Sequence, residues 1–370
     1  MSDPRIQKLA QVLVRYSVGV KKGDWVRIEG SCLSAELVRC AMVEVLKAGG
    51  YPTMRIGISD AAHAFYRHAS DKQLAFIPPS EFVEMDKIDC RLALWGGWNS
   101  KEMTGINPKR LALASQARKP LFNKMLARIA SGKLRWCGTL YPTHSSAQDA
   151  EMSLEEYEDF VYKAGMLDKK DPIAEWRKVS RRQAKLAKRL NRLSTIRISG
   201  PDTDITFGVR GRKWVNCDGH ENFPDGEVFT GPLEDSTEGH IRYAFPAIYG
   251  GREVENVRLW FKKGKVVEAR ADKGQDFLKA MLDMDPGARR VGELAFGTNY
   301  SIKRFTKHTL FDEKIGGTMH VAVGAGLPES GSKNKSGLHW DMVCDTREGF
   351  TVHGDGKSIM KNGRFLAGWF

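Results

Sequence analysis

The sequence predicts an α/β domain with a parallel sheet over residues 1–192, followed by a β-rich α+β domain over residues 193–370. Three observations support this fold class. The 370 residues are enough for about two domains of ordinary size. In the first half, helix-like and strand-like segments alternate, which is typical of a parallel sheet covered by helices. From Ile196 onward, apolar residues mostly alternate with a period of two, as in half-buried strands.

The first half begins with a predicted helix, because Asp3 can cap it and Pro4 suits its first position. A second helix is predicted over 33–46, where Gly49 and Gly50 end it. The histidines of a third helix, over 59–69, are interpreted as surface or packing residues. The strands predicted between these helices cover residues 25–28, 53–56, 91–95 and 134–140.

Two helices are predicted over 153–192, separated by a break at 169–172, and they lead into the second half. The second of them carries eight basic residues between Arg177 and Arg192, with apolar residues at helical spacing. The simplest interpretation is an amphipathic helix with a solvated basic face. A nucleic-acid-binding surface is the alternative, but aromatic residues do not interleave with the charges as single-strand binders require.

Short strands dominate the predicted second half. Period-two patterns mark strands at 196–198 and 205–209. A hairpin is predicted where 257–261 and 265–269 flank Lys263-Gly264. Residues 276–284 are predicted to form a helix.

Composition narrows the possible classes of protein. Hydrophobic residues make up 41% and charged residues 28%, as in ordinary globular proteins, although the net charge is +13. No apolar stretch is long enough for a membrane helix, and no apolar signal core stands at the N-terminus, so we expect a cytoplasmic protein without a membrane partner. The six cysteines form no C-x-x-C pair and are interpreted as reduced. A phosphate-binding glycine motif is also absent.

Carboxylates and histidines in the second half form a candidate metal site. His339 and Asp341 are two residues apart, so in a strand they point to the same face. His320 begins another strand, while Glu227 and Glu293 stand beside turn-forming residues. Each feature alone is more often structural. Together, oxygen and nitrogen donors of this kind suit Zn²⁺, Co²⁺ or Mn²⁺, and two ions would need a bridging carboxylate.

Four segments carrying these residues resemble the thermophilic metallo-aminopeptidase family, the group of aminopeptidases T and S. They cover residues 224–230, 292–299, 310–320 and 333–341. The resemblance implies a homodimeric exopeptidase that removes N-terminal residues from peptides with two divalent metal ions. It also implies a metal-binding C-terminal domain. The implied metal ligands are Glu227, Glu293, His320, His339 and Asp341.

Roles for individual carboxylates also follow from the resemblance. Glu293 is the expected bridging ligand, and Glu313 is a further candidate at the site. Glu227 or Glu313 would move the proton of the attacking water. The catalytic residues predicted in this way are Glu227, Glu293 and Glu313.

Two positions depart from the family pattern. Leu327 stands where many members have a tyrosine, seven residues after His320, and Gly226 stands where members often have a glutamate. The tyrosines that could replace the missing hydroxyl are Tyr243, Tyr249 and Tyr300.

These departures keep two other enzymatic interpretations open. His320, His339 and Asp341 could hold a single Fe(II) ion in a ring-cleaving dioxygenase, since two histidines and one carboxylate suit that chemistry. The chain could also be a peptidase-like protein with reduced activity. A basic binding module built on 177–192 is a third, non-enzymatic alternative, although a nucleic-acid partner is not expected.

Overall fold

The computed structural model describes residues 3–370, and Met1 and Ser2 of the predicted first domain lie outside the described residues. The chain divides into two compact units. The N-terminal unit comprises residues up to Ile173 together with Gly219–Pro224, and the C-terminal unit comprises Ala174–Asp218 and Asp225–Phe370. The predicted division into domains at residues 1–192 and 193–370 stays a prediction.

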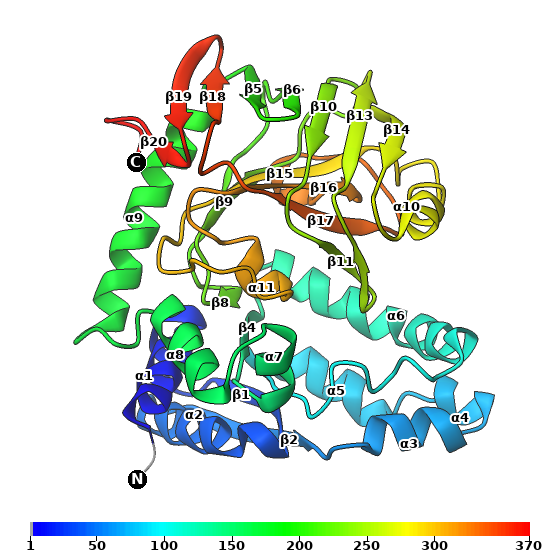
Figure 1. Cartoon of the computed structure of the whole chain (residues 1–370). Helices are drawn as coiled ribbons and strands as arrows, with labels where there is room; N and C mark the ends of the chain where they lie inside the picture. Colours follow the sequence, from blue (N-terminus) through cyan, green and yellow to red (C-terminus); the bar gives the residue numbers. More distant parts are fainter. Residues whose placement is uncertain (1–2) are drawn as a thin grey trace. The chain divides into compact units, whose positions relative to one another are not determined.

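A five-stranded parallel sheet forms the centre of the N-terminal unit (Figure 1), so the predicted α/β fold is confirmed. The four predicted strands lie side by side in it. A short fifth strand follows the two helices predicted over 153–192 in the sequence, and it pairs with the last of the four strands. In spatial order the strands are β2 (Tyr51–Gly57), β1 (Trp25–Ser31), β3 (Cys90–Trp95), β4 (Arg135–Leu140) and β8 (Asn222–Phe223).

Helices connect these strands. Asp3 caps the first helix as predicted, because its carboxylate accepts the backbone N–H of Arg5 at 2.8 Å. A π-helical turn follows this helix over Leu13–Ser17, and a 3₁₀ turn over Cys32–Ser34 precedes the second. The α-helices are α1 (Pro4–Val12), α2 (Ala35–Lys47), α3 (Ala61–His68), α4 (Asp71–Ala75), α5 (Pro79–Lys87), α6 (Pro108–Ala130), α7 (His144–Asp149) and α8 (Leu154–Ala164).

The basic segment forms helix α9 (Pro172–Leu190), which confirms the amphipathic interpretation. Its arginines and lysines from residue 177 onward are exposed or half-buried. On the opposite face, Trp176, Leu186 and Leu190 are fully buried. Burial of this apolar stripe explains why the segment is helical, since packing of an amphipathic face supplies most helical stability in proteins.

Two antiparallel sheets and a small hairpin build the C-terminal unit, so the predicted β-rich half is confirmed. The larger sheet contains, in spatial order, β14 (Lys265–Arg270), β13 (Arg258–Lys262), β10 (Glu238–Arg242), β6 (Thr203–Gly208), β5 (Thr195–Gly200), β18 (Thr351–Gly354), β19 (Lys357–Lys361) and β20 (Arg364–Phe365). The hairpin is β11 (Ala247–Tyr249) with β12 (Arg252–Val254). The predicted turn at Lys263-Gly264 joins β13 to β14, and both residues have positive φ.

The second sheet of this unit contains β17 (His339–Cys344), β16 (Met319–Gly324), β15 (Val291–Gly297), β9 (Glu227–Thr230) and β7 (Val215–Cys217). One hydrophobic core joins side chains of this sheet, of the larger sheet and of α9 and α10 (Gln275–Leu282). A one-turn helix, α11 (Thr309–Asp312), and a 3₁₀ turn over Pro328–Ser330 lie in the connections. No helix in residues 3–370 combines the length and the apolarity needed to cross a membrane.

Candidate metal centre

The register of the second sheet places the predicted ligands on one of its faces. Glu293 of β15 lies opposite Ala322 of β16, which in turn lies opposite Asp341 of β17. Directly paired residues share a face, and so do residues two apart in a strand. His320 is two residues from Ala322, and His339 is two residues from Asp341, so both belong to the same face.

Glu227 lies on the same face of the sheet, but on strand β9, which pairs with the edge of β15 that faces away from β16. It is the first residue of β9 and pairs with Gly297, four residues beyond Glu293 in the same strand. The preceding turn depends on Gly226, whose φ is +124°. A Cβ atom at this position would lie 2.6 Å from Cβ of Asn299, so no larger residue fits without movement of the backbone. This close approach is a physical reason for a glycine at position 226, which is one of the two positions that depart from the family pattern.

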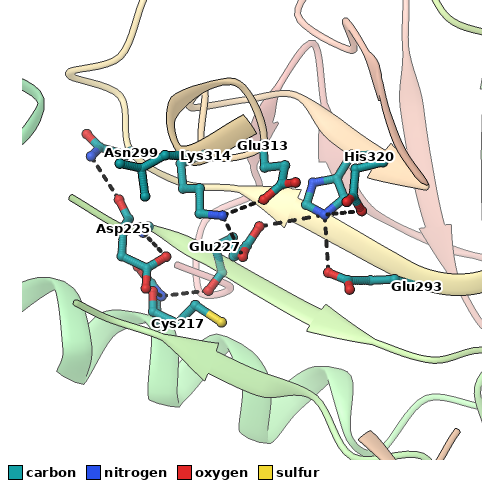
Figure 2. Close-up of polar contacts among 12 residues, drawn as sticks. Cys217, Asp225, Glu227, Glu293, Asn299, Glu313, Lys314 and His320 are labelled. Carbon is teal, nitrogen blue, oxygen red and sulfur yellow. Dashed lines mark hydrogen bonds and ion pairs between the residues drawn. The ribbon is translucent and has the colours of Figure 1, made fainter. Parts of the chain in front are cut away.

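The five side chains converge in two overlapping groups (Figure 2 shows the first). In the first group, Nε2 of His320 lies 3.2 Å from Oε1 of Glu293 and 3.7 Å from Oε2 of Glu227. In the second, Nε2 of His339 lies 3.6 Å from Oε2 of Glu293 and 3.3 Å from Oδ1 of Asp341. Glu293 therefore offers one oxygen to each group, as a bridging carboxylate does.

Unsatisfied polar atoms indicate that these groups are built for a ligand. In the part of the chain that is described, Oε2 of Glu227 and Oδ1 of Asp341 are buried and make no hydrogen bond, and neither does Nδ1 of His320. Buried polar atoms without partners are costly. A cation in the first group would give Oε2 of Glu227 a partner, and a cation in the second group would do the same for Oδ1 of Asp341. The residues present thus fit divalent metal ions.

One second-sphere contact sets the orientation of His339. Its Nδ1 atom donates to the backbone carbonyl of Ala325 at 2.8 Å. This contact directs Nε2 at Glu293 and Asp341, and a hydrogen bond of this kind is how proteins usually orient a histidine that binds a metal.

The metal-free site concentrates charge in a buried space. Burial lowers the pKa of His320, but its hydrogen bond to Glu293 and the charge of Glu227 outweigh this and raise it to about 10. Burial is likewise outweighed at His339, where Asp341 raises the pKa to about 10. Burial also raises the pKa of Glu293. At Asp341 the two histidines overcome burial and hold the pKa well below its usual range.

A buried lysine, which the sequence analysis did not single out, completes the cluster. Nζ of Lys314 lies 3.1 Å from Oε1 of Glu227 and 2.6 Å from Oε2 of Glu313, and its side chain is only 3% exposed (Figure 2). Burial disfavours its charge, but Glu227 and Glu313 outweigh burial and raise its pKa well above the usual range. The only sequence signal was its place directly after Glu313, because neither periodicity nor spacing distinguishes a buried lysine from an exposed one.

Glu313 lies beside these two groups rather than within them. It directly follows α11 and touches the cluster through Lys314. Burial raises the pKa of its carboxyl well above the usual range. Glu313 and Asp341 also border a small cavity whose apolar wall includes Ile248, Phe305 and Val343.

A third group of potential donors is less suited to a metal. Cys217, Asp225 and Glu227 also lie near one another. Burial raises the pKa of the Cys217 thiol well above its usual value, and the carboxylates nearby act in the same direction. A thiol with a raised pKa loses its proton less readily, which disfavours this group as a metal site.

The candidate tyrosines have other surroundings. The hydroxyl of Tyr300 donates to the backbone carbonyl of Gly363 at 2.9 Å. Tyr243 is fully buried in the core. The ring of Tyr249 lies 5.5 Å from that of Trp340. Leu327 stands just before the 3₁₀ turn, where its carbonyl accepts from Ser330 at 2.6 Å.

Comparison with known proteins identifies the family of this chain. Residues 2–365 match the family model described as thermophilic metalloprotease (M29). Aminopeptidase T of Thermus thermophilus is 27% identical over 405 residues, and aminopeptidase PepS of Streptococcus thermophilus is 25% identical over 410. Each alignment covers 98% of both chains.

Solved structures show the same relationship. Wild-type AmpT from Thermus thermophilus superposes with a TM-score of 0.86 at 26% identity, covering 98% of this chain and 99% of that one. A 2,5-dihydroxypyridine dioxygenase from Pseudomonas putida gives a TM-score of 0.62 at 14% identity, covering 99% of this chain and 98% of that one. The second likeness is one of fold alone.

Proposed function

Because the chain belongs to the M29 family of thermophilic metalloproteases, we propose that it is a metal-dependent aminopeptidase that removes N-terminal residues from peptides. The observation that carries this proposal is the pair of donor groups joined by Glu293 on one face of the second sheet. Two positions that share a carboxylate would suit a pair of divalent ions, as in two-metal hydrolases.

The proposed ligands divide between two positions. Glu227 and His320 would hold one ion, His339 and Asp341 would hold the other, and Glu293 would contribute to both positions. Zn²⁺, Co²⁺ or Mn²⁺ fits this mixed set of oxygen and nitrogen donors. When bound, such ions supply a nucleophilic water at neutral pH and polarise the peptide carbonyl.

Proton transfer is assigned to Glu313. Burial raises the pKa of the Glu313 carboxyl well above its usual range, a property of carboxyl groups that act as general acids. Glu313 also borders the cavity beside Asp341, where the substrate would be within reach. Glu227 is the alternative proton carrier. The ammonium of Lys314 contacts both side chains, at 3.1 Å from Oε1 of Glu227 and 2.6 Å from Oε2 of Glu313.

Selectivity for a free N-terminus follows from the same charges. The carboxylates around the cavity attract the positively charged α-amine of a peptide, whereas an acetylated N-terminus lacks that charge. The proposal also includes a homodimer, which the resemblance to the family supports, and the cytoplasmic location expected from the sequence. Light scattering after size-exclusion chromatography tests the dimer.

The decisive experiment is an assay of aminoacyl-p-nitroanilides with metal-free protein, to which Co²⁺, Zn²⁺ or Mn²⁺ is returned. We expect hydrolysis that depends on the metal, disappears on chelation and fails with N-acetylated substrates. No hydrolysis with any of the three metals would contradict the proposal. Oxygen consumption with Fe(II) and a dihydroxylated aromatic ring would instead support the dioxygenase alternative.

A further inference from the structure

Lys314 forms an ion pair with the donor group of Glu227, Glu293 and His320, but not with the group of Glu293, His339 and Asp341. Its ammonium binds Oε1 of Glu227, a member of the first group. In the described residues, no lysine or arginine forms an ion pair with Glu293 or Asp341, whose ion-pair partners are His320 and His339. The two groups therefore differ in charge, although both consist of carboxylates and histidine.

The backbone holds this lysine in place. The backbone N–H of Lys314 donates to the carbonyl of Phe311 at 3.0 Å, and its own carbonyl accepts from the N–H of Asn299 at 3.1 Å. The same Asn299 packs against the turn at Gly226 that precedes Glu227. Since one loop supports both side chains, the ammonium stays beside the first group.

A fixed ammonium opposes a metal ion at the first position for two reasons. It neutralises part of the carboxylate charge that would attract the ion, and it repels the ion directly at short range. Two like charges several ångströms apart in a buried site repel each other appreciably. Neither effect is as strong at the second position, where Lys314 makes no ion pair.

From this difference, and resting on the proposed function, we infer that Lys314 makes the two metal positions unequal. The position formed by Glu293, His339 and Asp341 binds its ion tightly, and the position at Glu227 and His320 binds its ion weakly. At limiting metal the protein holds one ion per chain, with the Lys314 ammonium beside the weak position.

Metal counting tests this inference without any assay of activity. Metal-free full-length protein is titrated with Zn²⁺ in metal buffers, and bound zinc is counted by native mass spectrometry. We expect two separated steps in the wild type, with dissociation constants at least about tenfold apart. Lys314→Met, which keeps the length and removes the charge, should tighten the second step. Lys303→Met, at an exposed lysine in the same connection, is the matched control and should not change either step.

Two further variants show which zinc-binding step belongs to which metal position. Asp341→Asn should abolish the tight step, and Glu227→Gln should abolish only the weak one. Two equal steps in the wild type, or an unchanged second step in folded Lys314→Met, would overturn the inference. If Lys314→Met fails to fold, the assignment of the two steps still tests the inference, because a tight step that is lost in Glu227→Gln would contradict it. A protein that binds zinc in two unequal steps yet hydrolyses no peptide would contradict the proposed function and leave this inference standing.

Discussion

Nδ1 of His339 lies 2.8 Å from the backbone oxygen of Ala325, and this contact turns the other ring nitrogen towards Glu293 and Asp341. Ala325 directly follows β16, the strand that carries His320. The loop after one ligand strand thus orients the ligand of the next. Substitution of His339 is therefore expected to remove both a proposed metal ligand and its hydrogen bond to the loop after β16.

His339→Ala should abolish metal-dependent turnover and weaken binding of the tighter ion by more than about 100-fold, since even second-sphere changes cost up to that much. Activity and metal content are measured on the same preparation. His68→Ala, on the exposed end of α3 in the other unit, is the control and should behave as wild type. Full activity of His339→Ala with unchanged metal content would remove this residue from the site.

Metal affinity should rise with pH. His320 and His339 have pKa values of about 10 in the metal-free protein, so both carry protons at pH 7. A metal binds only neutral imidazole and must release these protons, which makes binding more favourable as pH rises towards 10. We expect the apparent Zn²⁺ affinity to increase about tenfold or more per pH unit between pH 6 and 8. Competition with a chelator measures it, and a flat profile would contradict these pKa shifts.

Gln183 should contribute to the free energy of unfolding by holding together β7, which carries Cys217, and β9, which carries Glu227. The Gln183 side chain is fully buried on α9, and its Nε2 lies 2.8 Å from the backbone oxygens of both Cys217 and Glu227. Its Oε1 accepts from Thr298 at 3.0 Å. Gln183→Leu keeps the size but leaves these partners unpaired, at a cost of about 2–4 kcal/mol.

Chemical denaturation of Gln183→Leu measures that loss of stability. Arg182→Leu, at the exposed neighbouring position of the same helix, should change stability by less than about 0.5 kcal/mol. Equal stability of the two variants would show that the buried amide does not hold these strands.

Gly226→Ala should lower both stability and metal content. The new Cβ would lie 2.6 Å from that of Asn299 at a φ of +124°, so the turn must move and Glu227 with it. Strain of this kind costs about 1–3 kcal/mol. Thermal unfolding and zinc counting check the two effects. Gly105→Ala, where nothing lies within 4 Å of the added atom, serves as the control, and equal behaviour of both variants would contradict the prediction.

Glu44 should stabilise the N-terminal unit in a pH-dependent way. Its side chain is fully buried and binds Arg15 at 2.6 Å, Lys47 at 2.9 Å and Gln7 at 2.8 Å. Burial raises the pKa of this carboxyl, but Lys47 and Arg15 outweigh burial and bring it below its ordinary value of 4.5. The resulting stabilisation is fully present above pH 4.5 and is lost as pH falls through the lower, folded-state pKa.

Glu44→Gln should therefore lower the free energy of unfolding by about 1–2 kcal/mol at pH 7. The difference from wild type should shrink as the pH falls below 4.5. Denaturant unfolding at several pH values measures it. The control is Glu348→Gln, at an exposed position, which should leave the profile unchanged. A deficit in Glu44→Gln that persists at low pH would contradict the ionic origin of the effect.

Local patterns were enough to predict much of the fold. The cap at Asp3, the turn at Lys263-Gly264 and the stripe of α9 depend on residues close together in sequence, and all three were predicted correctly. The parallel sheet was also predicted, but not its fifth strand. β8 is only two residues long, and its pairing with β4 joins segments about 80 positions apart, which no local pattern encodes.

For the site, the sequence by itself supplied the candidate ligands, because the H-x-D spacing of His339 and Asp341 is a local property and the resemblance to the family implied the full set. Only the tertiary structure decided that Glu227, Glu293 and His320 meet, since that depends on the register of three strands. The structure alone also placed Lys314 and Gln183 against Glu227. A lysine and a glutamine normally face solvent, and only burial against specific partners distinguishes these two from the many that do.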